Sequence, residues 1–370
     1  MNMNVSFDAQ VFSFQEHGGI SRYYCELLKQ FSLMDGIEPS LIIKYSNSLC
    51  LRELDFVRIK HLFPAHKFKG RNEIIKLLNR RYVRRNFYVK SQPDVFHPTY
   101  YDPYFLDLLG DIPFVLTIYD MSHELYPALF SKFDFTAKNK KKVSAKASRI
   151  IAISEHTKKD IVALLNIPAS KIDVIPLATT LSPTGIGNTA IPLPNNYILY
   201  VGKRNTYKNF SFLLNAMKAL SQINIDSSLI CAGGGKFSTQ ESKDIHKLQL
   251  SDKIIQMDVD DYLLARLYTK AHALVVPSLY EGFGIPILEA FACGCPVLLS
   301  NRSSLPEVGG DAARYFDPEN LSSLVEMVAE VIDDNALADD MRTNGLNRAK
   351  LFSWRNTALK TRETYKKVLH

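Results

Sequence analysis

Short apolar strands alternate with amphipathic helices along almost the whole chain, and they do so in two series. Strand-like stretches of the first series lie at 5–12, 40–45, 94–100, 113–120, 148–154 and 171–178, and those of the second at 197–202, 228–235, 253–259, 272–278 and 296–301. Strands that are separated by helices pair in parallel, because the helix carries the chain back across the sheet. The alternation therefore predicts an α/β protein with two doubly wound parallel sheets.

A segment rich in Thr, Pro, Gly and Asn, residues 179–196, separates the two series and is typical of a linker between domains. The length of 370 residues agrees with two domains, since a single core rarely grows beyond about 300 residues. Ligands of doubly wound sheets bind beyond the carboxyl ends of the strands. We therefore expect the functional residues in the loops that follow the strands, in two domains that face one cleft.

The sequence contains no membrane-spanning run of about 18 apolar residues, and its first ten residues lack the basic and apolar regions of a secretory signal. We therefore expect the protein in the cytoplasm. Its five cysteines are few, odd in number and scattered, which argues against a disulfide framework. Cys293 and Cys295 have no second Cys or His cluster nearby, so they are interpreted as small buried residues rather than zinc ligands.

Positive charge is concentrated in the first half of the chain, within a formal net charge of +7. Residues 58–90, here named the basic segment, contain eleven Lys and Arg and a single acid, Glu73. A second basic cluster lies at 138–142. Such segments attract phosphates, whether on nucleic acid, on lipid headgroups or on a pyrophosphate-linked substrate. The alternative is a helix face that is only solvated.

The stretch EHGGISRYY places two glycines, Gly18 and Gly19, at the start of a predicted helix over 19–31. Glycine lets the backbone approach a ligand closely, and the N-terminus of a helix favours anions. The pattern indicates a phosphate site, although a tight loop without a ligand explains it equally well.

The stretch VGKRNTYKNF follows a predicted strand and places Arg204 and Lys208 where that strand gives way to a helix. Two cations at the carboxyl edge of a sheet suit a diphosphate, with Arg as a planar fork and Lys as a point charge. The alternative is a pair of solvated cations on a loop.

The stretch PSLYEGFGIPILEAFACGCP, residues 277–296, holds two glutamates eight positions apart around a glycine-rich turn. Glu289 falls about one turn into a predicted helix over 285–294, where a carboxylate can accept two hydrogen bonds from a vicinal diol such as ribose. Glu281, on the turn, is expected at the other end of the ligand. The pattern indicates a nucleotide sugar whose diphosphate lies over the helix N-terminus. The alternative for Glu289 is a favourable charge in a first helical turn.

Two other stretches look like ligand motifs and are assigned structural roles instead. Asp258 and Asp260 match the D-x-D that holds a metal in some sugar transferases, but they stand at a strand end, where Asp260 or Asp261 is expected to cap the next helix. AGGG at 232–235 differs from the G-x-G-x-x-G of a dinucleotide site. We therefore expect no metal and no dinucleotide cofactor.

Residues 277–318 closely resemble the C-terminal block of glycosyltransferase family 4, the retaining transferases of GT-B type. The resemblance extends to GGISRY, IAISEHTKKDI, YVGKRNTYKNF and the closing FSWRNTALKTRETYKKV, so it covers nearly the whole chain. It implies the GT-B fold, in which two Rossmann-like domains face a central cleft. On this basis we expect an acceptor-binding domain over 1–180 and a donor-binding domain over 181–352, with the helix 353–370 packing back on the first.

The resemblance also implies roles for individual residues. Arg204 and Lys208 would neutralise the donor diphosphate, with Lys203 in the place of Arg204 if the loop aligns one residue differently. Glu281 would contact the transferred sugar, and Glu289 would hold the ribose. The other donor-binding positions would be Gly18, Gly19, Ser154, Phe283, Gly284 and Ile285.

One position departs from the family pattern. Many members carry His-Asp where this chain has Tyr119 and Asp120, and the histidine of the family usually lies beside the sugar. Tyr119, Asp120 and His123 are the candidates to replace it, and Asp120 is also a catalytic candidate. His97, at the end of another predicted strand, is a further candidate for a sugar or acceptor contact. For both histidines the alternative is an ordinary structural role.

The resemblance implies a metal-independent hexosyltransferase that retains the anomeric configuration and uses a nucleotide diphosphate sugar, of mannose or rhamnose type, without a bound cofactor. The basic segment suggests a lipid-pyrophosphate-linked or oligosaccharide acceptor at the inner membrane leaflet. We therefore predict a role in bacterial surface polysaccharide, such as O-antigen or capsule, with peripheral binding at the cytoplasmic face and no nucleic-acid partner. The alternatives are a nucleotide-sugar epimerase on the same fold and a basic scaffold protein without enzymatic activity.

Overall fold

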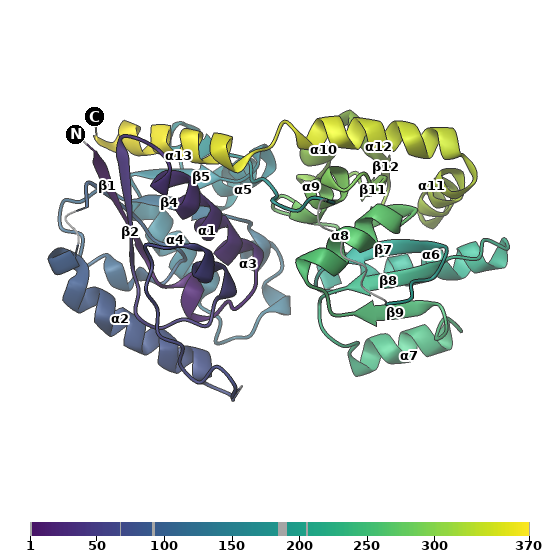
Figure 1. Ribbon diagram of the computed structural model, residues 1–370, viewed down its shortest axis with the longest axis horizontal. Coiled ribbons are helices and arrows are strands. Elements are labelled where there is room, and N and C mark those ends of the chain that lie inside the picture. Colours follow the sequence, from purple (N-terminus) through teal and green to yellow (C-terminus); the bar gives the residue numbers. More distant parts are fainter. Residues whose placement is uncertain (1, 67, 91–92, 184–190, 205, 370) are drawn as a thin grey trace. The chain divides into compact units, whose positions relative to one another are not determined.

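The computed structural model describes residues 2–66, 68–90, 93–183, 191–204 and 206–369. The chain forms two compact units (Figure 1), one made of Met1–Leu177 with Trp354–His370 and the other of Ala178–Ser353. Each unit is built from parallel strands that alternate with helices. Residues 184–190 of the expected linker and Lys67 of the basic segment lie outside the described residues.

The first unit contains two three-stranded parallel sheets, ordered β2-β1-β3 and β4-β5-β6, and a parallel bridge between Phe96 and Phe114 connects them. The strands are β1 (Met3–Asp8), β2 (Ile37–Ile42), β3 (Val95–His97), β4 (Val115–Ile118), β5 (Arg149–Ala152) and β6 (Ile172–Val174). The strand order reverses between β1 and β3. Loops that leave a sheet at such a switch point diverge and leave room for a ligand.

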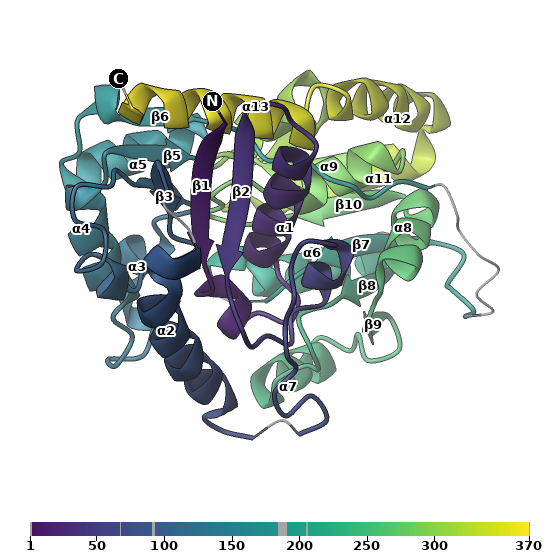
Figure 2. The same ribbon diagram turned by 60° about the vertical axis from the view of Figure 1, so that its left-hand side comes forward.

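The helices of the first unit surround these strands. They are α1 (Gly19–Ser32), α2 (Arg71–Lys90), α3 (Ser122–Leu125), α4 (Thr136–Lys146), α5 (Glu155–Leu165) and α13 (Trp354–Leu369), with short 3-10 helices η1 (Val11–Ser13), η2 (Leu49–Glu53), η3 (Pro103–Phe105), η4 (Pro127–Leu129) and η5 (Ala169–Lys171). Helix α1 buries Tyr23, Tyr24, Leu27, Leu28 and Phe31, which have helical spacing in the sequence. It contacts both β2 and α13 (Figure 2).

The closing helix α13 belongs to the first unit, and polar contacts with Asp173 hold it there. Asp173 of β6 accepts hydrogen bonds from Thr364 and Lys367 of α13, and from Arg149 of β5. Burial opposes the charge on Asp173, but these donors outweigh burial and lower its pKa to about 2.

Replacing Asp173 with asparagine is expected to lower the free energy of unfolding by about 1–2 kcal/mol at pH 7, after a discount for solvent screening. A carboxyl whose pKa falls from 3.8 to about 2 on folding stabilises the folded state above pH 3.8, and this contribution is lost as the pH falls through about 2. Urea unfolding of both proteins should therefore give stabilities that converge between pH 4 and pH 2. Asp226→Asn is the matched control, because Asp226 pairs with Lys253 while almost fully exposed. A gap for Asp173→Asn that stays constant with pH contradicts this account.

The second unit contains one six-stranded parallel sheet in the order β12-β11-β10-β7-β8-β9. Its strands are β7 (Tyr197–Val201), β8 (Ser228–Ala232), β9 (Ile254–Met257), β10 (Ala273–Val276), β11 (Val297–Ser300) and β12 (Arg314–Phe316). Counted from β7, this is the 3-2-1-4-5-6 order of a Rossmann sheet. The switch point therefore lies between β7 and β10.

Helices of the second unit cover this sheet and bury an apolar core that includes Ile198, Leu229, Val275 and Leu298. They are α6 (Phe210–Gln222), α7 (Thr239–Lys247), α8 (Asp261–Lys270), α9 (Ile285–Ala292), α10 (Leu305–Gly309), α11 (Leu321–Asp333) and α12 (Asn335–Ala349), with 3-10 helices η6 (Thr206–Lys208) and η7 (Gly310–Ala312). In the part of the chain that the structure describes, no helix of either unit is both long and apolar enough to cross a membrane.

The α/β fold predicted from the sequence, two Rossmann-like domains with parallel strands, is confirmed, but the first unit divides its strands between two three-stranded sheets instead of one. The predicted strand 5–12 ends at Asp8, because the chain turns there into η1. Strand β12 has no counterpart among the predicted strands.

One disulfide corrects the interpretation of the cysteines. Cys25 of α1 and Cys50 of η2 are bonded, with their Cα atoms 6.1 Å apart. The number and spacing of cysteines carry no sign of this pair, because it depends on the approach of α1 to η2 in the fold. Cys231, Cys293 and Cys295 are unbonded and buried, which agrees with the role expected for the last two.

Candidate active site

Three loops of the second unit leave adjacent strands at the carboxyl edge of its sheet. They follow β7, β8 and β10, which are neighbours in the order β10-β7-β8. A hydrogen bond of 2.8 Å from the N–H of Leu279 to the carbonyl of Tyr207 joins the first loop to the third. Lys208 and Glu281 therefore meet at the switch point of the sheet, although they are far apart in the sequence.

Lys208 and Glu281 form an ion pair in which Nζ lies 2.5 Å from Oε2, and both side chains are mostly buried. Ser278 donates a hydrogen bond of 2.8 Å to the other carboxylate oxygen of Glu281. Ser303 accepts one of 2.8 Å from the Glu281 N–H. Hydrogen bonds to both its side chain and its backbone thus hold Glu281 in place. The site presents the cation of Lys208 and the carboxylate of Glu281 together.

The start of α9 borders this ion pair. A small pocket there is lined by Tyr200, Val201, Lys208, Val275, Val276, Ser278, Glu281, Gly284, Pro286 and Ile287. Gly284 precedes the helix with a φ of +96°, and a Cβ at this position would meet Cδ1 of Ile287 at 2.8 Å, so the turn requires glycine. The N–H groups of Phe283, Gly284 and Ile285 lie at this helix N-terminus, whose partial positive charge favours an anion.

Glu289 is the fifth residue of α9 and is buried. Its Oε2 accepts a hydrogen bond of 3.0 Å from the hydroxyl of Tyr268 on α8. Burial raises the pKa of Tyr268 well above its ordinary value, and the Glu289 carboxylate raises it further, so the hydroxyl keeps its proton and donates. Tyr268 therefore orients the carboxylate. No signal in the sequence pointed to Tyr268, because α8 and α9 meet only in the fold.

Arg204, expected at the diphosphate, is committed to contacts inside the protein. Its side chain is only 3% exposed, and Nε donates a hydrogen bond of 2.8 Å to Glu241. Its two Nη atoms donate to the carbonyl oxygens of Gly233, Gly235 and Lys236. The guanidinium thus holds the glycine-rich loop after β8, and few of its donors remain for a ligand.

Lys203 stands next to Arg204 and has an exposed side chain. Its carbonyl oxygen accepts a hydrogen bond of 2.7 Å from the hydroxyl of Tyr200, which holds the backbone of the loop. Of the two alternatives for this loop, Lys203 as the second cation therefore agrees better with the geometry than Arg204 does. The sequence could not separate them, because both cations follow the same strand.

Gly18 and Gly19 lie at the start of α1 in the first unit, Gly18 as its N-cap. The side-chain oxygen of Gln15 accepts a hydrogen bond of 3.1 Å from the N–H of Ser21, one of the donors at this helix end. A Cβ on Gly18 would meet that oxygen at 2.5 Å. The contact with Gln15 thus explains Gly18 as well as a ligand does.

Two residues expected at a ligand have structural roles in the first unit. Ser154 is fully buried and caps α5, as predicted, by accepting a hydrogen bond of 3.0 Å from the N–H of Thr157. His97 is also fully buried, with Nδ1 2.6 Å from the Tyr365 hydroxyl and Nε2 2.9 Å from Oγ1 of Thr117. Burial lowers the pKa of His97 to about 3, so the ring is neutral. The expected sugar or acceptor contact of His97 is therefore corrected to a role in the core.

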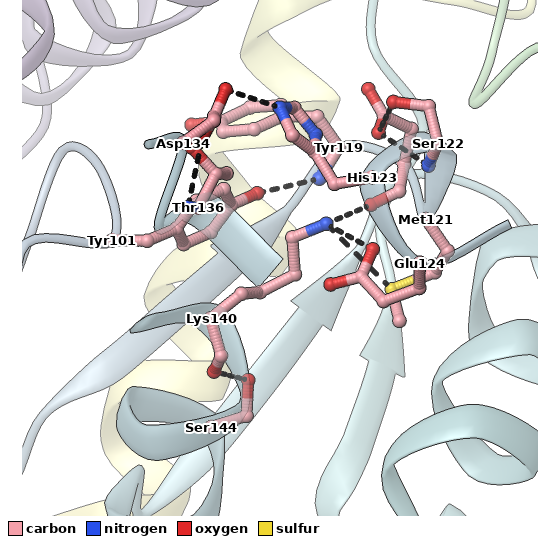
Figure 3. A network of polar contacts seen from close by, with 11 residues as sticks. Tyr101, Tyr119, Met121, Ser122, His123, Glu124, Asp134, Thr136, Lys140 and Ser144 are labelled. Carbon is pink, nitrogen blue, oxygen red and sulfur yellow. Dashed lines mark hydrogen bonds and ion pairs between the residues drawn. The ribbon is translucent and has the colours of Figure 1, made fainter. Parts of the chain in front are cut away.

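The candidates to replace the histidine of the family follow β4 (Figure 3). Tyr119 is buried, with its ring packed against tyrosine rings of α1. Asp120 accepts hydrogen bonds of 2.9 and 2.7 Å from the N–H and hydroxyl of Ser122. Burial opposes the charge on Asp120, but Lys140 and the Ser122 donors outweigh burial and hold its pKa below the ordinary value. Tyr119 thus belongs to the core, and Asp120 is a fixed anion.

His123 of α3 lies at the border of the same network and is partly exposed. Its Nε2 is 3.5 Å from Oδ2 of Asp134, and its ring stacks on Phe130 with the ring centroids 3.8 Å apart. Burial and the nearby Lys140 lower the pKa of His123, which favours the neutral ring at pH 7. Among the candidates, His123 is the one that combines partial exposure with a neutral imidazole.

Lys140 is a member of this network that the sequence did not indicate. Its side chain is buried, and Nζ donates hydrogen bonds of 2.8 Å each to Glu124 and to the carbonyl of Asp120 (Figure 3). In the sequence, Lys140 belongs to the basic cluster 138–142, whose members look equivalent. Only the packing of α4 against α3 turns this one lysine inward.

The D-x-D match is a helix cap and a neighbouring loop residue. Asp260, one of the two caps predicted, accepts a hydrogen bond of 2.8 Å from the N–H of Leu263 and caps α8. Asp258 accepts one of 3.0 Å from the side chain of Gln256. Among the residues with described positions, no group of three or more His, Cys, Asp or Glu side chains is placed to hold a metal ion.

Comparisons with known proteins place the chain in a family. The model of Glycosyltransferase Family 4 matches residues 17–182, and that of Glycosyl transferases group 1 matches residues 185–348. O-antigen chain mannosyltransferase B of Escherichia coli is 29% identical, over 94% of this chain and 96% of its own. Sucrose-phosphate synthase from Thermosynechococcus elongatus superposes with a TM-score of 0.78 at 19% identity, over 99% of both chains. Anabaena HepE, in complex with UDP and glucose, superposes with a TM-score of 0.74 at 17% identity, over 99% of this chain and 100% of its own.

The two family models follow one another and together span most of the chain. The solved structures share its two Rossmann-like units over nearly their full length. The paired glutamates at the start of α9 and the parallel sheets agree with this assignment. The chain therefore belongs to glycosyltransferase family 4 and has the GT-B fold.

Proposed function

We propose that this glycosyltransferase moves a mannosyl group, with retention at the anomeric carbon, from a nucleotide diphosphate sugar to a growing bacterial surface polysaccharide such as O-antigen. The relative that matches along nearly its whole length, an O-antigen chain mannosyltransferase, supports mannose over the alternative, rhamnose. The observation that carries the proposal is the Lys208–Glu281 ion pair beside the N-terminus of α9, at the switch point of the sheet.

The leaving diphosphate would lie over the start of α9, near Lys208 and Lys203. When the bond between the anomeric carbon and the phosphate oxygen breaks, negative charge develops on the diphosphate. The two ammonium groups and the N–H groups of Gly284 and Ile285 would stabilise that charge, and one such donor is typically worth about 3–4 kcal/mol. In this scheme the cations do the work that a metal ion does in other transferases.

Glu281 would accept hydrogen bonds from hydroxyls of the transferred sugar, while Lys208 keeps its carboxylate charged and in place. Its negative charge also favours the positive charge that develops at the anomeric carbon. The acceptor hydroxyl would then attack from the face that the diphosphate leaves. A phosphate oxygen would take the proton of that hydroxyl, so the configuration is retained and no separate base is needed.

Glu289 would hold the nucleoside by its ribose. Its carboxylate is buried and oriented by Tyr268, so it can accept two hydrogen bonds from a vicinal diol without first losing much motion. A donor held at the ribose and at the sugar spans the N-terminus of α9, where its diphosphate is required.

We propose a lipid-pyrophosphate-linked glycan at the cytoplasmic face of the membrane as the acceptor. The basic segment supports this choice, because α2 exposes a mixture of cationic and apolar side chains. They include Ile74, Leu77, Arg80, Arg81, Arg84 and Arg85. Helix faces of this composition bind anionic membrane surfaces.

Thermal unfolding in the presence of UDP, GDP, dTDP and their common sugars tests the donor site. A ligand at 100 times its Kd adds about 2.7 kcal/mol of stability. For a domain of about 150–250 residues, such as the second unit, each kcal/mol raises Tm by about 2–4 °C. We therefore expect one nucleotide sugar to raise Tm by several degrees. Transfer from that donor to an acceptor glycan is then measured, and the coupling constant of the anomeric proton in the product reports retention.

Glu289→Gln should abolish this stabilisation, because it removes the charge that holds the ribose. The variant still has an oxygen that accepts the hydrogen bond of Tyr268, so its fold is preserved. Tyr268→Phe is the matched control and should keep most of the stabilisation, since the carboxylate remains. Equal stabilisation of Glu289→Gln and the wild type would place the donor elsewhere.

A further inference from the structure

The segment that follows α3 exposes an unusual amount of apolar surface. Over residues 125–146, here named the α3–α4 surface, four large apolar side chains are exposed: Leu125 (39%), Leu129 (44%), Phe133 (84%) and Phe135 (57%). Single exposed apolar residues are ordinary, but several on one short segment, two of them aromatic, favour a site of contact with a partner. These residues lie outside the basic segment 58–90.

The same segment also carries exposed cations. The exposed lysines of the α3–α4 surface include Lys132, Lys138, Lys141 and Lys142. The single acid within it, Asp134, accepts a hydrogen bond of 2.8 Å from the N–H of Thr136 and faces Nε2 of His123 (Figure 3). Glu124, just before the segment, is paired with the buried Lys140. The acids are thus engaged within the network, and the lysines dominate the charge toward solvent.

The turn that carries Phe133 has a defined conformation. The N–H of Phe133 donates to Oγ of Ser131 at 3.2 Å, and the N–H of Asp134 donates to the carbonyl of Ser131 at 2.8 Å. Phe130, three residues earlier, stacks on His123. Because the turn is already ordered, inserting Phe133 into a partner costs little conformational entropy.

Helix α4 of the α3–α4 surface and helix α2 of the basic segment both contact the stretch around η3. Helix α4 contacts η3, and Lys140 of α4 lies over the ring of Tyr101 at 5.3 Å. On the other side, Arg80 of α2 lies over the ring of Tyr104 at 5.4 Å, and Arg84 donates to the Tyr104 carbonyl. Both helices therefore border the same short stretch around η3.

We propose that the α3–α4 surface is a membrane-docking element, in which Phe133 and Phe135 insert among lipid headgroups while the exposed lysines of the same segment contact anionic phosphates. Exposed aromatic side chains and exposed lysines on one segment fit an anionic bilayer, which offers hydrocarbon and negative charge at one interface. A nucleic acid offers the charge without the hydrocarbon. This contact adds to the proposed role of the basic segment and does not depend on the identity of the donor sugar.

Fluorescence of the full-length Phe133→Trp variant tests the proposal. The natural tryptophan, Trp354, is buried in α13, so it supplies a constant background. With vesicles of phosphatidylcholine and about 30% phosphatidylglycerol, we expect a blue shift of the emission and quenching by brominated acyl chains. Leu351→Trp, at an exposed apolar position of the second unit (64%), is the matched control and should show neither.

Charge-reversal variants test whether vesicle binding depends on this surface or on the positive charge of the protein in general. Replacing Lys141 and Lys142 with glutamate in the Phe133→Trp variant should weaken vesicle binding at least about 10-fold. Each lysine near an anionic membrane surface contributes to the free energy of binding. The same reversal at Lys243 and Lys247, exposed on α7, should change binding less than about twofold. These variants should keep the stabilisation by nucleotide sugar, so a failure here is distinct from a failure of the donor site.

Three results would overturn the proposal. The first is vesicle binding by Phe133→Trp without a blue shift of its emission, which would leave the basic segment as the contact. In that case neutralising Arg80, Arg81, Arg84 and Arg85 would abolish binding. The second is equal binding to vesicles of phosphatidylcholine alone. The third is an equal blue shift with a DNA duplex in place of vesicles, which would assign the surface to nucleic acid.

Discussion

Replacing Lys208 with methionine is expected to lower kcat for sugar transfer about 100- to 1,000-fold, the usual effect of removing one group that stabilises a developing negative charge. Lys208 is the cation placed beside Glu281 and the start of α9, where the diphosphate would leave. Methionine keeps the length of the side chain and removes only the charge. Initial rates with a saturating donor measure kcat, and the thermal unfolding of the variant confirms that it is folded.

The ion pair allows a sharper test of the same site. Glu281→Gln should also reduce kcat strongly, because the amide cannot anchor Lys208 or counter positive charge at the anomeric carbon. Residues that act as a unit are not additive, so the double variant should be little slower than Lys208→Met alone. Lys236→Met is the matched control, because Lys236 is exposed and contributes only its carbonyl to the contacts of Arg204. If the kcat of Lys208→Met stayed within twofold of the wild-type value, Lys208 would have no role in stabilising the leaving diphosphate.

Replacing Arg204 with methionine is expected to lower the free energy of unfolding of the second unit by about 3 kcal/mol. The substitution leaves the Glu241 carboxylate without its partner and the carbonyls of the loop after β8 without their donors. Urea unfolding measures the loss. Lys203→Met should leave the stability within about 0.5 kcal/mol, because exposed side chains contribute little.

The same two variants distinguish the roles of the neighbouring cations. If Lys203 is the second cation at the diphosphate, Lys203→Met should lower kcat or donor affinity while leaving the fold intact. Glu241→Gln should reproduce much of the destabilisation by Arg204→Met, because both substitutions break the Arg204–Glu241 ion pair. If Arg204→Met kept the stability of the wild type but lost donor binding, Arg204 would be assigned to binding the diphosphate instead of Lys203.

Local features of the fold were predictable because they depend on a few neighbouring residues. The serine at 154 caps its helix as predicted, and the aspartate at 260 is one of the two caps predicted for its helix, because an N-cap side chain bonds to a backbone N–H two or three residues ahead. The apolar stripe of α1 follows from the helical period. The order of strands and helices along the chain then favoured parallel strand pairing in two α/β domains.

Contacts between distant segments were not predictable in the same way. His97 stands at a strand end like a ligand-binding residue, but Tyr365, from the last helix of the chain, covers it. The disulfide between Cys25 and Cys50 depends on how α1 approaches η2. Tyr268 reaches Glu289 because α8 packs on α9. In each case the partner lies on another element, and the sequence carries no mark of the approach.

The sequence by itself determined the two α/β domains with parallel strands, the family and the turn that carries Glu281, because these follow from periodicity and from a long specific motif. The tertiary structure alone decided which cations face outward. Arg204 and Lys203 are adjacent in one loop, yet the carbonyls after β8 bind one of them and leave the other exposed. Lys140 is likewise drawn inward from its basic cluster by Glu124. A charged side chain takes the place where its burial is compensated, and that compensation comes from residues that only folding brings near.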